Sequence, residues 1–176
     1  MMVLDTTILI DALHGKQAAL GKIIEMEEAG ETICTTQINA LELFKGAYLP
    51  TKSDEYILKI KKLLGAFVVL AINEDAYEWF AALSASLRAR GESINDFDEL
   101  IAAITMTNGA AIVSNDSHFM RIPGLEVISF SSPNCGWRSP IPHAGQGGVV
   151  GISRYACRGG GKGGGGGDVL RRHLRV

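Results

Sequence analysis

Four acidic residues stand where apolar stretches of this 176-residue chain begin or end, and their side chains are the best suited to chemistry. Asp5 ends a short apolar run, Glu42 lies beside an apolar helical face, Asp98 precedes an apolar run, and Asp116 follows another. If these carboxylates converge unpaired, their like charges disfavour mutual ionisation. A divalent cation relieves that repulsion, and Mg²⁺ or Mn²⁺ prefers oxygen ligands. The four acids therefore predict a metal site suited to phosphate chemistry.

Taken singly, each acid has an ordinary structural explanation. Asp5 is able to cap a following helix, and Glu42 to sit in solvent on a helix surface. Asp98 fits the first turn of a helix, where an acid complements the helix dipole, and its neighbour Asp96 fits the cap itself. Asp116 fits a turn. Only the set of four points to a shared site.

The apolar pattern places these acids on an α/β fold. Short strands are predicted at residues 3–4, 32–35, 67–70, 111–114 and 126–129. Helices are predicted from Thr6, at 16–28, from Thr36 to about Pro50, at 52–64, at 73–90, and from Asn95 or Asp96 to Gly109. Apolar strands separated by helices predict a mostly parallel sheet with helices on both faces. Ligands of such sheets bind beyond the carboxyl ends of strands, where Asp5 and Asp116 fall.

Composition divides the chain near Phe130. Residues 131–176 hold seven Lys/Arg, one acid and 13 of the 21 glycines, so their net charge is +6 and residues 1–130 carry −8. The glycine-rich segment offers too little apolar surface to offset its chain entropy, so disorder is the favoured interpretation. A basic RNA-binding arm and a non-native sequence are the two alternatives. The acidic remainder argues against a broad phosphate-binding surface, but not against an enzyme that meets nucleic acid through metal and a few bases.

Other features set the class of protein. Cys34, Cys135 and Cys157 have no metal-ligand spacing, and Cys34 reads as a small buried residue. No basic segment precedes the first strand as in a signal peptide, and no apolar run approaches the ~20 residues that span a bilayer. We therefore expect a cytoplasmic protein without a membrane segment.

Residues 3–11, 41–46, 98–103 and 112–119, taken in this order, resemble the motifs of the PIN-domain family, and residues 122–127 resemble the end of that domain. The resemblance covers about residues 1–130 and is greatest to the VapC toxins of type II toxin–antitoxin pairs. It implies a three-layer PIN-like fold and Mg²⁺-dependent endonucleolytic cleavage of RNA, with Mn²⁺ as a second candidate ion. It also implies a cognate VapB-like antitoxin and a homodimer, whose surface we expect on the helices between Lys52 and Arg90.

By position, the resemblance assigns the metal-binding and catalytic roles to Asp5, Glu42, Asp98 and Asp116. Asp96 is a candidate additional ligand. Thr6 and Ser114 match supporting hydroxyl positions, and Asp11 reads as structural. His118 is interpreted as a positional or surface residue rather than a general base. The tail after Phe130 has no counterpart in the family pattern.

Two other classes of function were weighed. A PIN-like module that binds RNA or a protein partner without cutting is the alternative, although the presence of all four acids argues against it. A Rossmann-type nucleotide binder needs a glycine fingerprint after the first strand, and the stretch after Asp5 contains none. The sequence thus favours a metal-dependent ribonuclease.

Overall fold

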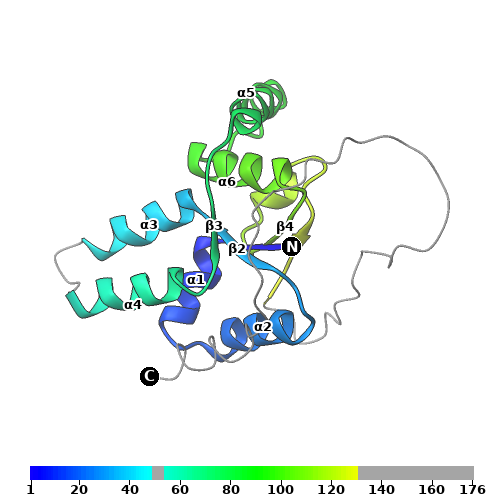
Figure 1. The fold of residues 1–176 in the computed structure, drawn as a ribbon. Helices are drawn as coiled ribbons and strands as arrows, with labels where there is room; N and C mark the ends of the chain where they lie inside the picture. The colour runs from blue at the N-terminus through cyan, green and yellow to red at the C-terminus, as the bar shows by residue number, and fades with distance from the viewer. Residues whose placement is uncertain (49–53, 131–176) are drawn as a thin grey trace.

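A computed structural model describes residues 1–48 and 54–130, and these form a five-stranded sheet with helices on both faces (Figure 1). The strands are β1 (Met2–Leu4), β2 (Ile33–Thr36), β3 (Val68–Leu70), β4 (Ala111–Val113) and β5 (Val127–Ile128). They lie in the order β3-β2-β1-β4-β5, and every neighbouring pair is parallel. All carboxyl ends of the strands therefore face the same edge of the sheet.

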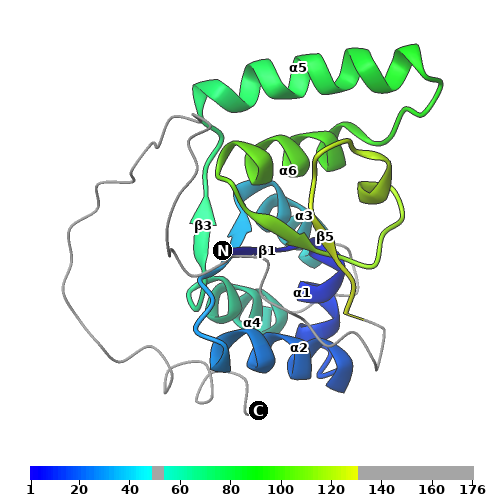
Figure 2. The same cartoon turned by 90° about the vertical axis from the view of Figure 1, so that its right-hand side faces the viewer.

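Six helices complete the three layers: α1 (Thr6–Leu13), α2 (Gln17–Glu28), α3 (Gln37–Ala47), α4 (Asp54–Leu64), α5 (Glu74–Ala89) and α6 (Asp96–Thr107). Figure 2 shows α1, α2 and α4 on one side of the sheet and α6 on the other, with α5 packed outside α6. Helix α3 contacts α1, α4 and α6, so it joins the two layers. A 3₁₀ turn, η1 (Phe119–Arg121), follows β4.

Two apolar cores lie against opposite faces of the sheet because strand side chains alternate. In β4, Ala111 and Val113 pack into the core shared with α1, α2 and α4, whereas Ile112 packs into the core shared with α6. Helix α6 is buried along its middle, where residues 101–105 have no exposed surface. The central strands and α6 thus form the rigid support for residues at the carboxyl edge.

The predicted fold class is confirmed: the protein is α/β, with a parallel five-stranded sheet between helical layers. The expected helix stops also hold, since Gly30 and Gly109 follow α2 and α6 with positive φ angles of 73° and 60°. The fifth strand is shorter than the predicted 126–129. None of the described helices has the length and apolarity needed to cross a membrane. Lys52 and the tail at 131–176 lie outside the described residues.

Candidate metal centre

Asp5 is held at the end of β1 by hydroxyl and amide donors. It occupies the N-cap position of α1, but its carboxylate makes no capping bond to that helix. Instead it accepts hydrogen bonds from Thr7 Oγ1 at 2.7 Å and Ser114 Oγ at 2.8 Å, and from Asn39 Nδ2 at 3.5 Å. The residue is only 4% exposed. Three donors from three parts of the chain thus fix a nearly buried carboxylate.

Glu42 is positioned by a chain of hydrogen bonds that begins at the start of α3. Thr36 and Asn39 form a capping box there, in which Asn39 Oδ1 accepts from the Thr36 backbone N–H at 3.1 Å. This leaves Asn39 Nδ2 free to donate to Thr6 Oγ1 at 3.0 Å. The Thr6 hydroxyl then donates its single proton to Glu42 Oε2. The cap of α3 therefore sets the direction of the bond that holds Glu42.

Asp98 and Asp116 approach each other from α6 and from the loop after β4, with His118 between them. His118 Nδ1 lies 3.4 Å from Asp116 Oδ1 and 3.6 Å from Asp98 Oδ2, and this buried nitrogen has no hydrogen-bond partner. The Asp116 backbone N–H donates to Ser114 Oγ at 3.0 Å, and its Oδ1 accepts from the His118 N–H at 2.9 Å. One ligand atom from each of the three side chains lies within 4.8 Å of the other two.

The electrostatics join Asp98 to all three other predicted acids. The pKa of Asp98 is raised from 3.8 to about 6, mainly by partial burial and then by the negative charges of Asp116, Asp5 and Glu42 in that order, while His118 opposes the shift. Each cause acts on the charged carboxylate, which is poorly solvated and faces like charges. The other three acids predicted from sequence are therefore close enough to oppose the ionisation of Asp98.

A divalent cation fits this donor set. The oxygen ligands match the preference of Mg²⁺ and Mn²⁺, and a positive ion would remove the repulsion that raises the pKa of Asp98. Asp96 is exposed at the start of α6 and is not in the three-residue ligand cluster. Asp11 pairs with Lys16 at 2.7 Å, in keeping with a structural role.

Sequence reasoning missed three parts of this arrangement: Thr7, Asn39 and the approach of His118 to the acids. Thr7 lies two residues after Asp5, a spacing at which hydroxyls often bond a neighbouring acid. Asn39 was visible as the third residue of a helix that begins after a threonine. His118 offered only its closeness to Asp116, because its contact with Asp98 depends on where α6 lies.

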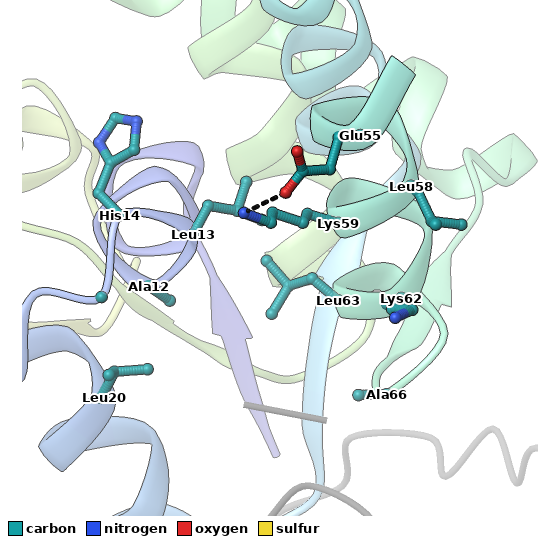
Figure 3. Close-up of a pocket in the computed structure, with 11 residues that line it drawn as sticks. Ala12, Leu13, His14, Leu20, Glu55, Leu58, Lys59, Lys62, Leu63 and Ala66 are labelled. Atoms are coloured by element: carbon teal, nitrogen blue, oxygen red, sulfur yellow. Dashed lines mark ion pairs between the residues drawn. The ribbon is translucent and has the colours of Figure 1, made fainter. Parts of the chain in front are cut away.

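A second hollow lies at the far end of α1 from Asp5. Its volume is about 410 Å³, and it is formed by the end of α1, the start of α2 and one side of α4 (Figure 3). Its walls are mostly apolar, with an ion pair between Lys59 and Glu55 at 3.1 Å on the α4 side. The lining includes Leu13, Leu20, Leu58, Lys62 and Leu63.

Comparison with known proteins gives consistent results. The PIN domain family model matches residues 2–125. Ribonuclease VapC19 of Mycobacterium tuberculosis is 28% identical over 127 residues, which is 72% of this chain and 98% of the relative. The tRNA(fMet)-specific endonuclease VapC of Shigella flexneri is 25% identical over 130 residues, or 73% of this chain and 97% of that protein.

Solved structures show the same fold. VapBC2 from Rickettsia felis, crystallised with a DNA fragment from its promoter, matches with a TM-score of 0.68 and 22% identity. The match covers 73% of this chain and 97% of the solved chain. At this level of identity the likeness supports the arrangement of strands and helices described above.

Proposed function

The chain belongs to the PIN domain family, and on that premise we propose that it is a Mg²⁺-dependent endoribonuclease, the toxin of a VapBC-like toxin–antitoxin pair. The observation that carries the proposal is the mutual repulsion of Asp98 with Asp116, Asp5 and Glu42 at one edge of the sheet. Two relatives match this chain over nearly their whole length. One is named as a ribonuclease and the other as a tRNA-specific endonuclease, and these names support RNA as the substrate.

In this proposal the four acids hold the ion and the surrounding polar side chains keep them in place. Bound Mg²⁺, or Mn²⁺, would supply a Lewis acid at the phosphodiester and a water of lowered pKa. Asp5, Glu42, Asp98 and Asp116 are the residues that would bind it. Thr7 and Ser114 hold the Asp5 carboxylate, and Thr6 holds the Glu42 carboxylate. These two acids therefore need little rearrangement when the ion binds.

The test is RNA cleavage by Asp5→Asn and Asp98→Asn variants, measured on end-labelled single-stranded RNA with Mg²⁺ and with EDTA. We expect both substitutions, and EDTA, to lower cleavage by at least about 10³-fold, since metal-assisted catalysis supplies several kcal/mol. Circular dichroism serves as the control for folding. Wild-type cleavage in either variant or in EDTA would contradict the proposal, and metal binding without cleavage by the wild type would favour a binding module.

We place the VapB-like antitoxin in the apolar hollow between α1, α2 and α4. The hollow has a volume of about 410 Å³ and lies at the opposite end of the helix that begins after Asp5, so an extended partner segment is able to reach both. The net charge of −8 on residues 1–130 favours a partner segment that is basic beyond its apolar part.

Co-expression with a VapB-like antitoxin tests that placement. Leu58→Glu should abolish co-purification with the antitoxin while leaving Mg²⁺-dependent cleavage intact, because a charge would be buried in the hollow. Met120→Glu is the matched control: Met120 is 64% exposed on η1, outside the hollow, and should have no effect on co-purification. Retention of the partner by Leu58→Glu would exclude this hollow as its site.

We propose that two copies pair through the edge strand β3 and the first half of α5. Four large apolar side chains are exposed in this short segment: Val68 (54%), Val69 (42%), Tyr77 (60%) and Trp79 (46%). An edge strand has unpaired backbone groups, and exposed apolar side chains on it and on the helix that follows offer surface that a second copy would cover. Trp79→Glu should convert the dimer to a monomer in light scattering, whereas a dimer that survives both Trp79→Glu and Val69→Glu would place the interface elsewhere.

A further inference from the structure

We propose that Lys45 and Phe97 form a subsite for the nucleotide next to the phosphate that is cleaved, with the ammonium binding a flanking phosphate and the ring contacting a base. This inference rests on the proposed ribonuclease function and names where its substrate lies. Both residues lie outside the acid cluster, and neither is among the site residues predicted from the sequence.

Both residues lie beside the acids on the same two helices. Lys45 follows Glu42 by three residues on α3, a spacing that puts the two side chains next to each other on the helix surface. Phe97 immediately precedes Asp98 on α6. The two helices bring Lys45 Nζ over the Phe97 ring, 6.0 Å from its centroid. A strand of RNA with one phosphate at the acids has its neighbouring nucleotide within reach of this pair.

The charge on Lys45 is available to a ligand. Lys45 is exposed and has no ion pair with a carboxylate in residues 1–48 and 54–130, whereas Lys16, Lys22, Lys59 and Arg90 each pair with one. It stands in a domain segment of net charge −8, on the same helix as Glu42 and beside the residue that precedes Asp98. An unpaired cation at that place offsets part of the field that repels the RNA backbone.

The ring of Phe97 adds a second kind of contact. It is half-buried, with part of its surface packed against the core between α5 and α6 and part left accessible. Its backbone is held in the helix cap, where its N–H donates to Asn95 Oδ1 at 3.0 Å. Aromatic rings next to basic side chains are the usual platform for unpaired bases, since every base offers a π-face. The pair thus suits single-stranded RNA.

The kinetic test compares cleavage of one end-labelled, mixed-sequence single-stranded RNA by matched lysine variants. Lys45→Ala should raise KM about five- to tenfold and leave kcat within about twofold, because a phosphate contact contributes to binding rather than to the chemical step. Lys45→Arg should retain most of the wild-type KM. Lys61→Ala is the control, since Lys61 is exposed on α4 away from the acids and should leave KM unchanged.

A binding test isolates the phosphate contact from catalysis. In the Asp98→Asn background, log K for association with the same RNA should fall linearly with the logarithm of the salt concentration. Replacing Lys45 by Ala should make this line less steep by about one unit of slope. Phe97→Leu, which keeps an apolar side chain against the core, should weaken binding about three- to tenfold without changing that slope, whereas Phe97→Tyr should retain binding.

The inference and the proposed function fail in different ways. Loss of cleavage in Asp5→Asn together with unchanged KM and salt slope in Lys45→Ala would overturn the subsite alone. Full cleavage by Asp5→Asn would overturn the ribonuclease proposal, whatever Lys45 does. Loss of antitoxin co-purification in Lys45→Ala, with RNA binding intact, would overturn the subsite and assign the pair to the protein partner.

Discussion

Asp5 and Asp98 belong to one acid cluster, but the chain holds them in opposite ways. Asp5 is 4% exposed and accepts bonds from Thr7, Ser114 and Asn39. The carboxylate of Asp98 receives no hydrogen bond from the described residues, and its side chain is 18% exposed beside Asp116 and His118. The Asp5 half of the site is fixed by protein donors. In the Asp98 half, the Asp98 carboxylate lies near like charges and an imidazole and accepts no hydrogen bond from the described residues.

This difference separates two tasks that a metal site requires. Donors that are already in place fix the position of Asp5, so little ordering remains when an ion binds. The raised pKa of Asp98 shows that its charged form lacks compensation, and an ion supplies what the protein does not. We infer that the Asp5 half determines where the ion sits and the Asp98 half provides much of the drive to bind it.

The largest expected effect is the same for both halves. Asp5→Asn and Asp98→Asn should each lower cleavage by at least about 10³-fold, because both remove a charge from the ion's ligands. The measurement is initial rate at saturating Mg²⁺. Partial rescue of Asp98→Asn, but not of Asp5→Asn, by high Mg²⁺ would sharpen the division of tasks. Rescue of Asp5→Asn, but not of Asp98→Asn, by high Mg²⁺ would contradict it.

The same two variants should change stability in opposite directions in metal-free buffer. Asp98→Asn should raise the free energy of unfolding at pH 7 by on the order of 2 kcal/mol, because it removes a charged carboxylate whose pKa is raised to about 6. Asp5→Asn should lower it by about 1–3 kcal/mol, because an amide has one acceptor oxygen where the carboxylate has two, so it cannot accept from Thr7 and Ser114 at one position and from Asn39 at the other. Urea titration monitored by circular dichroism measures both, and a stability change of the same sign in the two variants would remove the distinction between the halves.

The pH dependence isolates Asp98. Its folded-state pKa of about 6 lies above the unfolded value of 3.8, so the folded protein holds the proton of Asp98 more tightly than the unfolded chain does. The stability that this group contributes is therefore fully present below pH 3.8 and is lost as pH rises through about 6. The stability advantage of Asp98→Asn over the wild type should therefore be near zero at pH 4 and reach its full value at pH 7. Saturating Mg²⁺ should remove this advantage and reverse its sign, since the wild type then gains ligand-binding energy. An advantage that is independent of pH would contradict the assignment to Asp98.

A smaller effect tests the support of the Asp5 half. Asn39→Ala removes the bond from the Thr36 N–H to Asn39 Oδ1 in the capping box of α3, and Asn73→Ala removes the side-chain cap of α5, where Asn73 Oδ1 accepts from Ala76 N–H at 2.9 Å. Each should lower the free energy of unfolding by about 1–2 kcal/mol. Only Asn39→Ala should also lower cleavage, by about tenfold, because Asn39 bonds Thr6 and Asp5. Equal cleavage by the two variants would show that Asn39 acts on the helix alone.

The sequence predicted the fold and the position of the acids where local pattern decides them. Apolar runs bounded by glycines predicted the strands and helix ends, and the rule for parallel sheets predicted that Asp5 and Asp116 would share an edge. These signals are short-range, and the structure repeats them closely.

What the sequence did not reveal depends on contacts between distant segments. The Ser114 hydroxyl reaches Asp5 because β4 is the neighbour of β1, and strand order is not encoded in the strands themselves. The capping box of Asn39 was readable locally, but its second bond to Thr6 needs α1 and α3 side by side. His118 looked like a surface residue because its closeness to Asp98 arises only when α6 packs under the loop after β4.

The smallest expected effect concerns His118, whose ring nitrogen Nδ1 lies near both Asp98 and Asp116. Its positive form lowers the pKa of Asp98, so His118→Ala should move the acid limb of the pH–rate profile to higher pH. The rate at pH 8 should fall no more than about threefold, because the substitution removes neither a carboxylate nor the backbone bond from residue 118 to Asp116. A general base would behave differently, since its loss costs about 10²–10⁴-fold at every pH where it is needed. The pH profile of His118→Ala therefore separates a residue that tunes the Asp98 half from one that takes part in proton transfer.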